Sequence, residues 1–340
     1  FMHLFKYVLL LIIVTVTSCK KKEMENMPMV DQLQNGMLII NEGLFQQNTA
    51  SLSWIDWSED NVNNTFFEQK NERMLGDVAN DILHYGGKLY ITVSTSSTVE
   101  ILDYRSGKSI HQINMIENGI PKQPRELKGY QGKIFVSCFD GFVDVFDTIS
   151  FDLIQRIQIG SNPEAMMVKG NELFVSNTGG LNYPDVDSTI SIINMDALTE
   201  TRKLLVGKNP GPMQFDENGN LCVITSRANS PLNKQMVRLN ADTYTMDTIY
   251  TMNITKLEKM GNKILVLESN YSTTGLHLFN CSTRSFELMH FIPSNQFTTL
   301  YNIQYDALRQ QIMCFDAVSF TNLGFVNIYS ANGAFINKKQ

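Results

Sequence analysis

The chain has 340 residues, of which 28 are Lys or Arg and 34 are Asp or Glu, so its formal net charge is −6. Its hydrophobic content of 43% is enough to bury a core, which excludes an intrinsically disordered chain. The acidic balance argues against nucleic-acid binding, because the only basic run is residues 20–22.

An apolar run near the start is typical of an export signal. Residues 7–14 are uninterrupted apolar residues, too few for a membrane-spanning helix, which needs about 20. Residues 16–19, Val-Thr-Ser-Cys, resemble a bacterial lipobox, in which the cysteine is diacylated and the signal is cut just before it. We therefore expect residues 1–18 to be a lipoprotein signal peptide and Cys19 to carry the lipid. The alternative is a secretory signal or membrane anchor with an incidental cysteine.

Residues 19–36 are then the lipidated cysteine and a flexible tether. Three lysines followed by Glu23 and Glu25 resemble the surface-export signal of Bacteroidota lipoproteins. We expect a protein held at the outer membrane by its lipid anchor only and exposed on the cell surface, with a periplasmic orientation as the alternative.

The remaining residues, 37–340, are built from one repeated unit of short strands. A first apolar strand, a polar loop and a second alternating strand recur along the chain, which is the pattern of half-buried and buried β-strands. Equivalent positions of the first strand lie about 46 residues apart on average, close to the length of a four-stranded propeller blade. These positions are Leu38, Leu89, Ile134, Leu173, Leu221, Ile264 and Ile312. The spacing predicts an all-β fold, a seven-bladed β-propeller with four-stranded antiparallel blades.

Two sets of motifs resemble known families. Residues 173–177 and 188–194 resemble the repeat of YVTN-type, YncE-like propellers, which have a Tyr-Val-Thr-Asn strand followed by a Val-Ser-Val-Ile-Asp strand. Residues 41–45 and 75–79 resemble the DUF5074-type surface lipoproteins of Bacteroidota. Some propellers of that type capture vitamin B12 on a TonB-dependent outer-membrane transporter, so the resemblance implies a corrinoid ligand and such a transporter as partner.

The resemblance also implies a way of closing the ring. In the family the end of the chain supplies the innermost strand of the first blade, whereas residues 334–337 here are predicted to be the outermost strand of the seventh. Either residues 24–36 supply the missing strand or the sequence is truncated. We expect truncation and an incomplete closure.

The remaining chemistry-bearing residues do not form a recognisable catalytic motif. Cys138, Cys222, Cys281 and Cys314 are expected to be buried and unpaired, since three of them fall on non-neighbouring blades. The histidines do not converge as metal ligands. Acidic residues at the inner rim could hold Ca²⁺, as in propeller lactonases. The only plausible set is Asp77, Asp81, Asp140 and Glu164. We expect no enzyme activity, no cofactor and no metal.

Long loops rich in polar and aromatic residues are the remaining indication of function. In a propeller, the loops after the first strand and the connections into the innermost strands gather on one face around the channel. Amide and aromatic side chains there suit a large, neutral, amide-bearing ligand or a protein partner, and ordinary solvated loops are the alternative. We expect the ligand-binding residues to be Phe45, Gln46, Asp77, Arg125, Phe139, Glu164, Asn177, Tyr183, Arg227, Tyr271 and Phe320.

These observations predict a monomeric surface lipoprotein that binds cobalamin, another corrinoid or a similarly bulky nutrient and hands it to an outer-membrane transporter. Two alternatives belong to other classes of protein. One is a Ca²⁺-dependent propeller lactonase or lyase, and the other is a cell-surface interaction scaffold without a small ligand.

Overall fold

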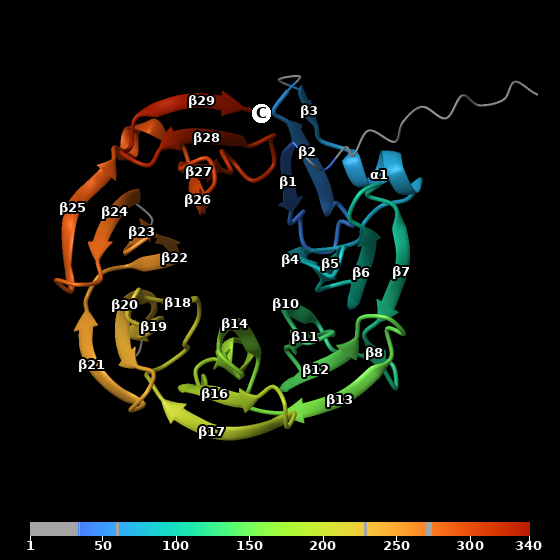
Figure 1. Cartoon of the computed structure of the whole chain (residues 1–340), viewed down its shortest axis with the longest axis horizontal. Helices are drawn as coiled ribbons and strands as arrows, with labels where there is room; N and C mark the ends of the chain where they lie inside the picture. Colours follow the sequence, from blue (N-terminus) through green and yellow to red (C-terminus); the bar gives the residue numbers. More distant parts are fainter. Residues whose placement is uncertain (1–32, 34, 59–60, 228–229, 270–273) are drawn as a thin grey trace, which may run out of the picture.

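The computed structural model describes residue 33 and residues 35–58, 61–227, 230–269 and 274–340. Within these ranges, seven antiparallel sheets surround a common axis, so the predicted seven-bladed propeller is confirmed (Figure 1). The predicted signal peptide and Cys19 lie outside the described residues. In the described ranges, no helix combines the length and the apolar character needed to cross a bilayer.

The strands of each blade follow one another in sequence from the channel to the rim. Blade 1 has β1 (Gly36–Asn41), β2 (Ser51–Asp56) and β3 (Asn61–Asn63), and the short helix α1 (Phe66–Asn71) follows it. Blade 2 has β4 (Ala79–Tyr85), β5 (Lys88–Val93), β6 (Thr98–Asp103) and β7 (Ser109–Asn114), and the small hairpin of β8 (Ile116–Glu117) and β9 (Ile120–Pro121) follows it. Blade 3 has β10 (Pro124–Tyr130), β11 (Lys133–Cys138), β12 (Phe142–Asp147) and β13 (Leu153–Gln158).

The remaining four blades each have four strands. Blade 4 has β14 (Pro163–Lys169), β15 (Glu172–Asn177), β16 (Thr189–Asn194) and β17 (Thr199–Leu205). Blade 5 has β18 (Met213–Phe215), β19 (Leu221–Arg227), β20 (Ser230–Asn240) and β21 (Thr245–Tyr250). Blade 6 has β22 (Ile254–Met260), β23 (Lys263–Ser269), β24 (Thr274–Asn280) and β25 (Ser285–Ile292). Blade 7 has β26 (Leu300–Asp306), β27 (Gln311–Asp316), β28 (Phe325–Ser330) and β29 (Phe335–Lys339). Short 3-10 turns lie at η1 (Gly180–Asn182) and η2 (Ser294–Gln296).

Ring closure falls between blade 7 and blade 1. Among the described residues β1 pairs with β2 only, so blade 1 has three strands where the other blades have four. The last strand, β29, ends beside blade 1 (Figure 1). An apolar cluster joins Ile55 of blade 1 to Met313, Val326 and Ile328 of blade 7. Among the described residues, this apolar cluster therefore helps to hold blade 7 against blade 1. Residues 24–32 and 34, which were considered for the missing strand, lie outside the described residues.

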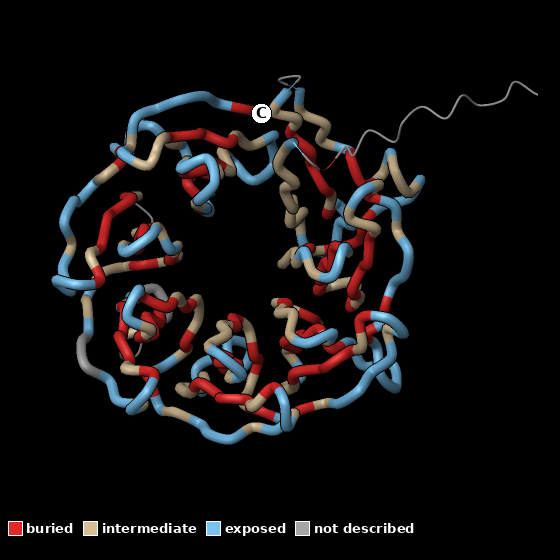
Figure 2. Tube along the Cα trace, in the orientation of Figure 1, coloured by how far each residue is buried: buried red, intermediate tan, exposed pale blue. Residues whose placement is uncertain are grey.

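The core lies between neighbouring blades rather than inside any one of them. The central strands bury both faces, as in β11, where residues 134–138 are all buried. One cluster joins Tyr90 and Ile101 of blade 2 to Leu127 and Val136 of blade 3. Figure 2 shows the buried positions concentrated in the inner strands and the exposed ones along the outermost strands. The central strands have near-continuous apolar sequences because each sheet packs against a neighbouring blade on both of its faces.

A polar side chain is nevertheless buried at the equivalent position of one strand in every blade, which is β2 in blade 1 and the third strand in blades 2 to 7. These residues are Ser53, Glu100, Asp144, Ser191, Arg238, His277 and Asn327. The charged ones have a partner of opposite charge: Arg238 lies 2.8 Å from Asp216, and Asp144 lies 2.9 Å from Lys122. The His277 ring is hydrogen-bonded to the Glu268 carboxylate at 3.0 Å. A buried charge is tolerated only when it is paired and hydrogen-bonded. This repeated feature is not evident from apolar periodicity alone.

Hydrogen bonds between innermost strands fix the ring around the channel. The Asp81 carboxylate accepts from the backbone amide of Leu127, and the Glu126 carboxylate accepts from that of Met166, both at 2.8 Å. Burial raises the pKa of both carboxyl groups. Between blades 6 and 7, Glu258 accepts from the amide of Tyr305 at 3.1 Å. Each of these bonds joins one blade to the next.

The four described cysteines, Cys138, Cys222, Cys281 and Cys314, are buried and none forms a disulfide, as expected. Burial raises the pKa of Cys314 to about 12, so its thiol stays protonated and unreactive at neutral pH.

Glu258 should make the stability of the ring depend on pH. Burial raises the pKa of Glu258 from the ordinary 4.5 to about 7, so the folded chain holds this proton more tightly than the unfolded chain does. The free energy of unfolding should therefore fall as pH rises from 4.5 and level off above 7. Denaturant titrations at several pH values should show a smaller fall in Glu258→Gln, which keeps an acceptor for Tyr305 but cannot ionise. A variant with the same pH dependence as wild type would contradict this assignment.

Candidate ligand-binding face at the channel mouth

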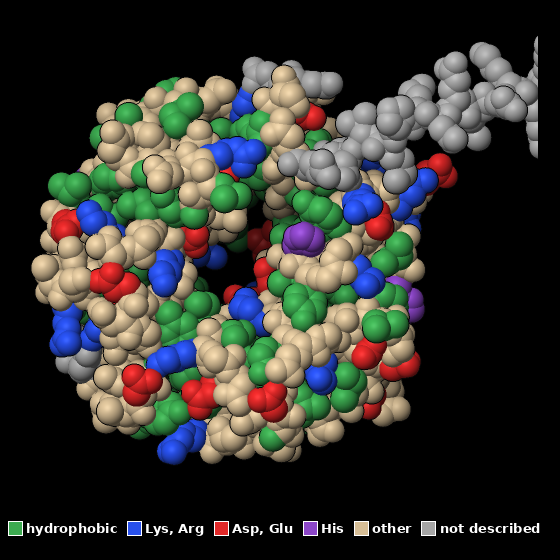
Figure 3. Space-filling view, viewed as in Figure 1, with side chains coloured by type: hydrophobic (Ala, Val, Ile, Leu, Met, Phe, Trp, Pro, Cys, Tyr) green, Lys and Arg blue, Asp and Glu red, His purple; other side chains and the backbone are tan. Residues whose placement is uncertain are grey.

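One end of the propeller gathers two kinds of connection. Because neighbouring strands of a blade are antiparallel, loops between the second and third strands emerge at the same end as connections from each outermost strand to the next innermost strand. We call this end the loop face; its described loops include residues 94–97, 139–141, 178–188 and 317–324. Residues 42–50, between β1 and β2, also lie there, because the Gln46 amide donates to Asp77 in the connection that leads to β4. Figure 3 shows that the centre of the ring is hollowed, with Lys, Arg, Asp and Glu side chains around the opening.

Exposed aromatic and aliphatic side chains project from these loops. Phe45 of blade 1 is 66% exposed, Tyr183 of blade 4 is 61% exposed and Phe320 of blade 7 is 55% exposed. Leu181 and Leu323 on the same loops are also exposed. Several such side chains on the loops of one end offer apolar contact area to a ligand or a protein partner.

Tyr301 connects the aromatic loops to the channel rim. Its ring packs edge-on against Phe320 with centroids 5.6 Å apart, and its hydroxyl donates to Glu42 at 2.6 Å. Burial and the Glu42 carboxylate raise the pKa of Tyr301 well above its ordinary value, so the hydroxyl stays protonated. Blades 1 and 7 are therefore joined at the rim by a hydrogen bond as well as by their apolar cluster.

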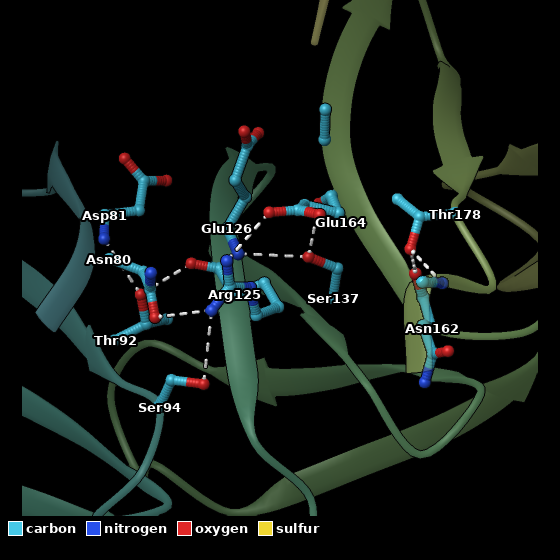
Figure 4. A network of polar contacts seen from close by, with 12 residues as sticks. Asn80, Asp81, Thr92, Ser94, Arg125, Glu126, Ser137, Asn162, Glu164 and Thr178 are labelled. Carbon is cyan, nitrogen blue, oxygen red and sulfur yellow. Dashed lines mark hydrogen bonds and ion pairs between the residues drawn. The ribbon is translucent and has the colours of Figure 1, made fainter. Parts of the chain in front are cut away.

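Arg125 is the centre of a polar network on the opposite part of the rim. Its guanidinium donates to Glu164 at 2.7 Å and to the Asn80 side-chain oxygen at 3.0 Å, so it bridges three innermost strands (Figure 4). The Phe139 ring lies under the guanidinium, 4.5 Å from its carbon. Thr92 and Ser137 hold the backbone carbonyls of residues 125 and 164 at 2.6 and 2.7 Å. Arg125, Phe139 and Glu164 thus lie together, as the sequence-based site requires.

Asp77 and Gln46 lie together for a structural reason. The Asp77 carboxylate accepts from the backbone amides of Gln46 at 3.1 Å and Asn48 at 3.4 Å. Asp77 is 9% exposed, and Gln46 contributes its backbone to this contact. Their position fits a role in shaping the loop that carries Phe45.

Asn177 does not reach the surface of the loop face. Its side chain is fully buried, its amide nitrogen donates to the hydroxyls of Thr189 and Ser191, and its oxygen accepts from the amide of Gly160. We therefore withdraw Asn177 from the set of ligand contacts, because every polar atom of its amide already has a partner inside the protein.

Two further candidates lie on blades 5 and 6. Arg227 ends β19 and donates to the side-chain oxygen of Asn253 at 3.4 Å. Tyr271 lies outside the described residues. Of these two candidates, Arg227 is therefore the one that the structure places.

The four carboxylates considered for Ca²⁺ have separate partners. Asp77 binds loop amides, Asp81 binds the Leu127 amide, Glu164 pairs with Arg125, and Asp140 pairs with Arg156. Across the residues that the structure describes, no group of three or more His, Cys, Asp or Glu side chains is arranged to hold a metal ion.

Sequence reasoning missed Tyr301 and Glu42, although a signal for Tyr301 exists. Each of the strands β4, β10, β14, β22 and β26 begins with a buried residue followed by one that faces the mouth. Aligning these strands makes Tyr301 equivalent to Arg125 and Glu164. A cavity of about 410 Å³ lined by Gly36, Trp57 and Tyr305 lies at the other end of the blade 1 and blade 7 junction, outside the loop face.

Asp77→Ala should loosen the loop that carries Phe45. Removing the carboxylate takes away the charged acceptor of two backbone amides, and a hydrogen bond to a charged group contributes about 1.5–3 kcal/mol. Hydrogen exchange at Gln46 and Asn48 should accelerate at least tenfold in Asp77→Ala, while Asp152→Ala at an exposed turn serves as control. Unchanged exchange at both amides would show that the carboxylate does not hold this loop.

Comparison with known proteins gives a family and a fold. The sequence of residues 35–334 matches the model of DUF5074, described as a domain of unknown function. No curated protein matches the sequence.

Solved structures with a similar fold include proteins from two bacteria and a designed protein. A quinoprotein alcohol dehydrogenase-like protein (BT1487) from Bacteroides thetaiotaomicron is similar with a TM-score of 0.65 and 12% identity, covering 89% of this chain and 74% of that one. Hydrazine synthase of Kuenenia stuttgartiensis has a TM-score of 0.58 and 15% identity, covering 72% and 73%. The computationally designed Ika8 protein has a TM-score of 0.59 and 10% identity, covering 91% and 89%. Such identities show the fold alone. The match over residues 35–334 shows that the chain belongs to the DUF5074 family.

Proposed function

We propose that this protein is a cell-surface lipoprotein that captures a bulky, amide-bearing nutrient and passes it to a TonB-dependent outer-membrane transporter. Cobalamin or another corrinoid is the specific ligand proposed. The observation that carries the proposal is the pair of features on the loop face. Phe45, Tyr183 and Phe320 are exposed there, and an ordered polar network centred on Arg125 lies at the rim. The resemblance of residues 41–45 and 75–79 to DUF5074-type surface lipoproteins, some of which capture vitamin B12, also supports it.

The two features suit different parts of such a ligand. Exposed aromatic rings offer flat apolar contact to a macrocycle, and their burial on binding contributes most of the affinity. Amide side chains of the ligand need directional donors and acceptors, which the Asn80, Arg125 and Glu164 network holds in place. Because these polar groups are already ordered by the fold, little conformational entropy is lost when the ligand binds.

The proposal involves binding and release without a chemical step. The loop face stands around the channel on the scaffold of seven blades, while the predicted lipid at Cys19 would hold the protein at the membrane. A ligand bound at the mouth therefore remains accessible from outside, which suits transfer to a membrane transporter.

A protein-interaction scaffold is the second candidate. Leu181 and Leu323 are exposed beside the aromatic residues, and aliphatic side chains of this kind also suit contact with another protein. In that case the transporter itself would cover the loop face and no corrinoid would bind.

Cobalamin titration of the purified chain tests the proposal. We expect binding at micromolar or lower ligand concentration, and a Kd at least tenfold weaker in Phe320→Ala and in Phe45→Ala, since one such anchor contributes over 1 kcal/mol. Leu308→Ala is the control, because Leu308 is 94% exposed on a hairpin at the opposite end.

Absence of binding by wild type at micromolar cobalamin would refute the corrinoid proposal. Equal losses in Leu308→Ala and Phe320→Ala would move the site away from the loop face.

A further inference from the structure

Blade 1 has an open edge on the side of the channel. The buried polar residue Ser53 places β2 in the role of a third strand, so β1 has the role of a second strand. Within the described residues β1 pairs with β2 only, which leaves the backbone groups of its channel-side edge without a ladder partner. The cavity of about 410 Å³ lies at the start of this edge, between Gly36 and Leu38 of blade 1 and Tyr305 of blade 7.

Four other blades show where in the sequence a strand for this edge would lie. In blades 2, 3, 4 and 6 the innermost strand has seven residues and ends three positions before the second strand begins, as Tyr85 does before Lys88. Since β1 begins at Gly36, the same spacing assigns residues 27–33 to blade 1. Of these, residues 27–32 lie outside the described residues.

The sequence of residues 27–33 fits this assignment. The strands β10, β22 and β26 bury their first and fourth residues, and the corresponding residues here are Met27 and Val30. The second residue of β4, β22 and β26 has no partner in the ladder, because the register shifts there. Pro28 falls at this second position, where its missing N–H removes no ladder hydrogen bond.

The described residues just before β1 make the contacts expected after an innermost strand. Leu33 is buried in the apolar cluster shared by blades 1 and 2, as Tyr85 packs on the cluster shared by blades 2 and 3. The Asn35 carbonyl accepts from the amide that follows β2 at 3.0 Å, and the Gly87 carbonyl accepts from the amide that follows β6 at 3.3 Å. The chain therefore enters β1 in the same way as it enters the second strand of blade 2.

The Asn41 side chain is oriented for a donor from the missing strand. Its nitrogen donates to the hydroxyls of Ser51 and Ser53 at 3.0 and 2.8 Å, as the Asn177 nitrogen does to the equivalent hydroxyls of blade 4. The Asn177 oxygen also accepts from the amide of Gly160, three residues before β14. No donor reaches the Asn41 oxygen within the part of the chain that the structure describes, and the equivalent donor is the amide three residues before position 27.

The hydrogen bond of Ile82 agrees with Met29 as the third residue of such a strand. In blades 3 and 4, the fourth amide of the innermost strand donates to the acidic third residue of the preceding blade. Before blade 7 that third residue is Lys256, which is no acceptor, and the Ile303 amide donates to the side chain of its own neighbour instead. The Ile82 amide likewise donates to its own neighbour Asp81, at 2.9 Å.

We propose that residues 27–33 bind along the open edge of β1 as the innermost strand of blade 1, with Leu33 opposite Gly36 and Asp31 opposite Leu38. Such a strand is antiparallel to β1, so it begins at the loop face and ends beside the cavity. Residues 20–26 then leave the propeller at the channel mouth rather than at the opposite end.

This strand also determines which end of the propeller lies near the membrane. If Cys19 carries the lipid, as the proposed function requires, residues 19–26 can span at most about 28 Å between the membrane and the loop face. The mouth is then held on the membrane side, where an outer-membrane transporter can receive the ligand. The strand itself does not rest on the proposed function.

Disulfide trapping in the purified chain tests the register. Gln32 lies opposite Met37 in the proposed pairing, and its amide points away from β1, as the equivalent amide of Tyr305 points away from its own blade. Opposed residues of this kind have Cα atoms about 4.5 Å apart, within reach of a disulfide. Gln32→Cys with Met37→Cys should cross-link at least tenfold faster than the control pair Gln32→Cys with Ile39→Cys, which is two residues out of register. Equal rates would overturn the proposal.

Hydrogen exchange tests the pairing without a cross-link. The Asp31 and Leu38 amides point at each other's strands, because amides alternate along a strand. Leu38 should exchange as slowly as Ile39 in wild type and at least tenfold faster in Asp31→Pro, while Ile39, which bonds to β2, changes less than twofold. Gln32→Pro is the matched control, since the Gln32 amide faces the channel. An unprotected Leu38 amide in wild type, or one that Asp31→Pro does not affect, would overturn the strand.

Energy transfer from the lipidated protein to vesicles with acceptor-labelled headgroups tests the orientation. A donor dye on Ser319→Cys at the loop face should transfer more energy than one on Ile149→Cys, which is 85% exposed at the opposite end. More transfer from Ile149→Cys would overturn the orientation. A chain that does not bind vesicles would refute the lipoprotein part of the proposed function, while cross-linking and exchange still decide the strand.

Discussion

Face-to-face packing of neighbouring sheets is the constraint on which the rest of the structure depends. Every blade buries both faces of its central strands, so no blade has a complete core without the next one, as the cluster shared by Tyr90 of blade 2 and Val136 of blade 3 shows. Sheets that pack in this way and also twist must fan around an axis, which brings the innermost strands to a common channel. Carboxylates such as Asp81 and Glu126 then fix the spacing of those strands by accepting backbone amides of the next blade.

Because of this packing, the strands stabilise the fold while the loops are free to contact a ligand. The strands are occupied by core contacts and by paired buried charges such as Arg238 with Asp216, whereas the loops at one end have no packing role in common. Loop tips can therefore carry exposed aromatic residues such as Phe45 and Phe320 without weakening the core. The mouth combines these rings with fixed polar groups, and this combination supports a ligand-binding role for the face.

The sequence predicted the architecture well because a blade repeats every 46 residues or so and each repeat carries the same apolar strand pattern. The last strand of blade 7 was also predictable from residues 334–337, and β29 spans Phe335–Lys339. The sequence could place Arg125 and Glu164 at the channel mouth, because both lie at the start of innermost strands. It could not show that the two side chains form an ion pair.

Side-chain direction was the part that the sequence could not supply. Asn177 and Arg227 both lie at the end of a second strand, yet Asn177 is buried with all its polar atoms paired and Arg227 lies at the rim. Asp77 has a loop-shaping contact that depends on residues 31 positions away in sequence.

Hydrogen exchange of the whole chain with and without saturating cobalamin would show where on the propeller a ligand binds. If the loop face is the recognition surface, protection should appear in residues 42–50, 178–188 and 317–324 and be absent from opposite-end hairpins such as residues 148–152. Protection confined to the outermost strands or to the opposite end would contradict the account.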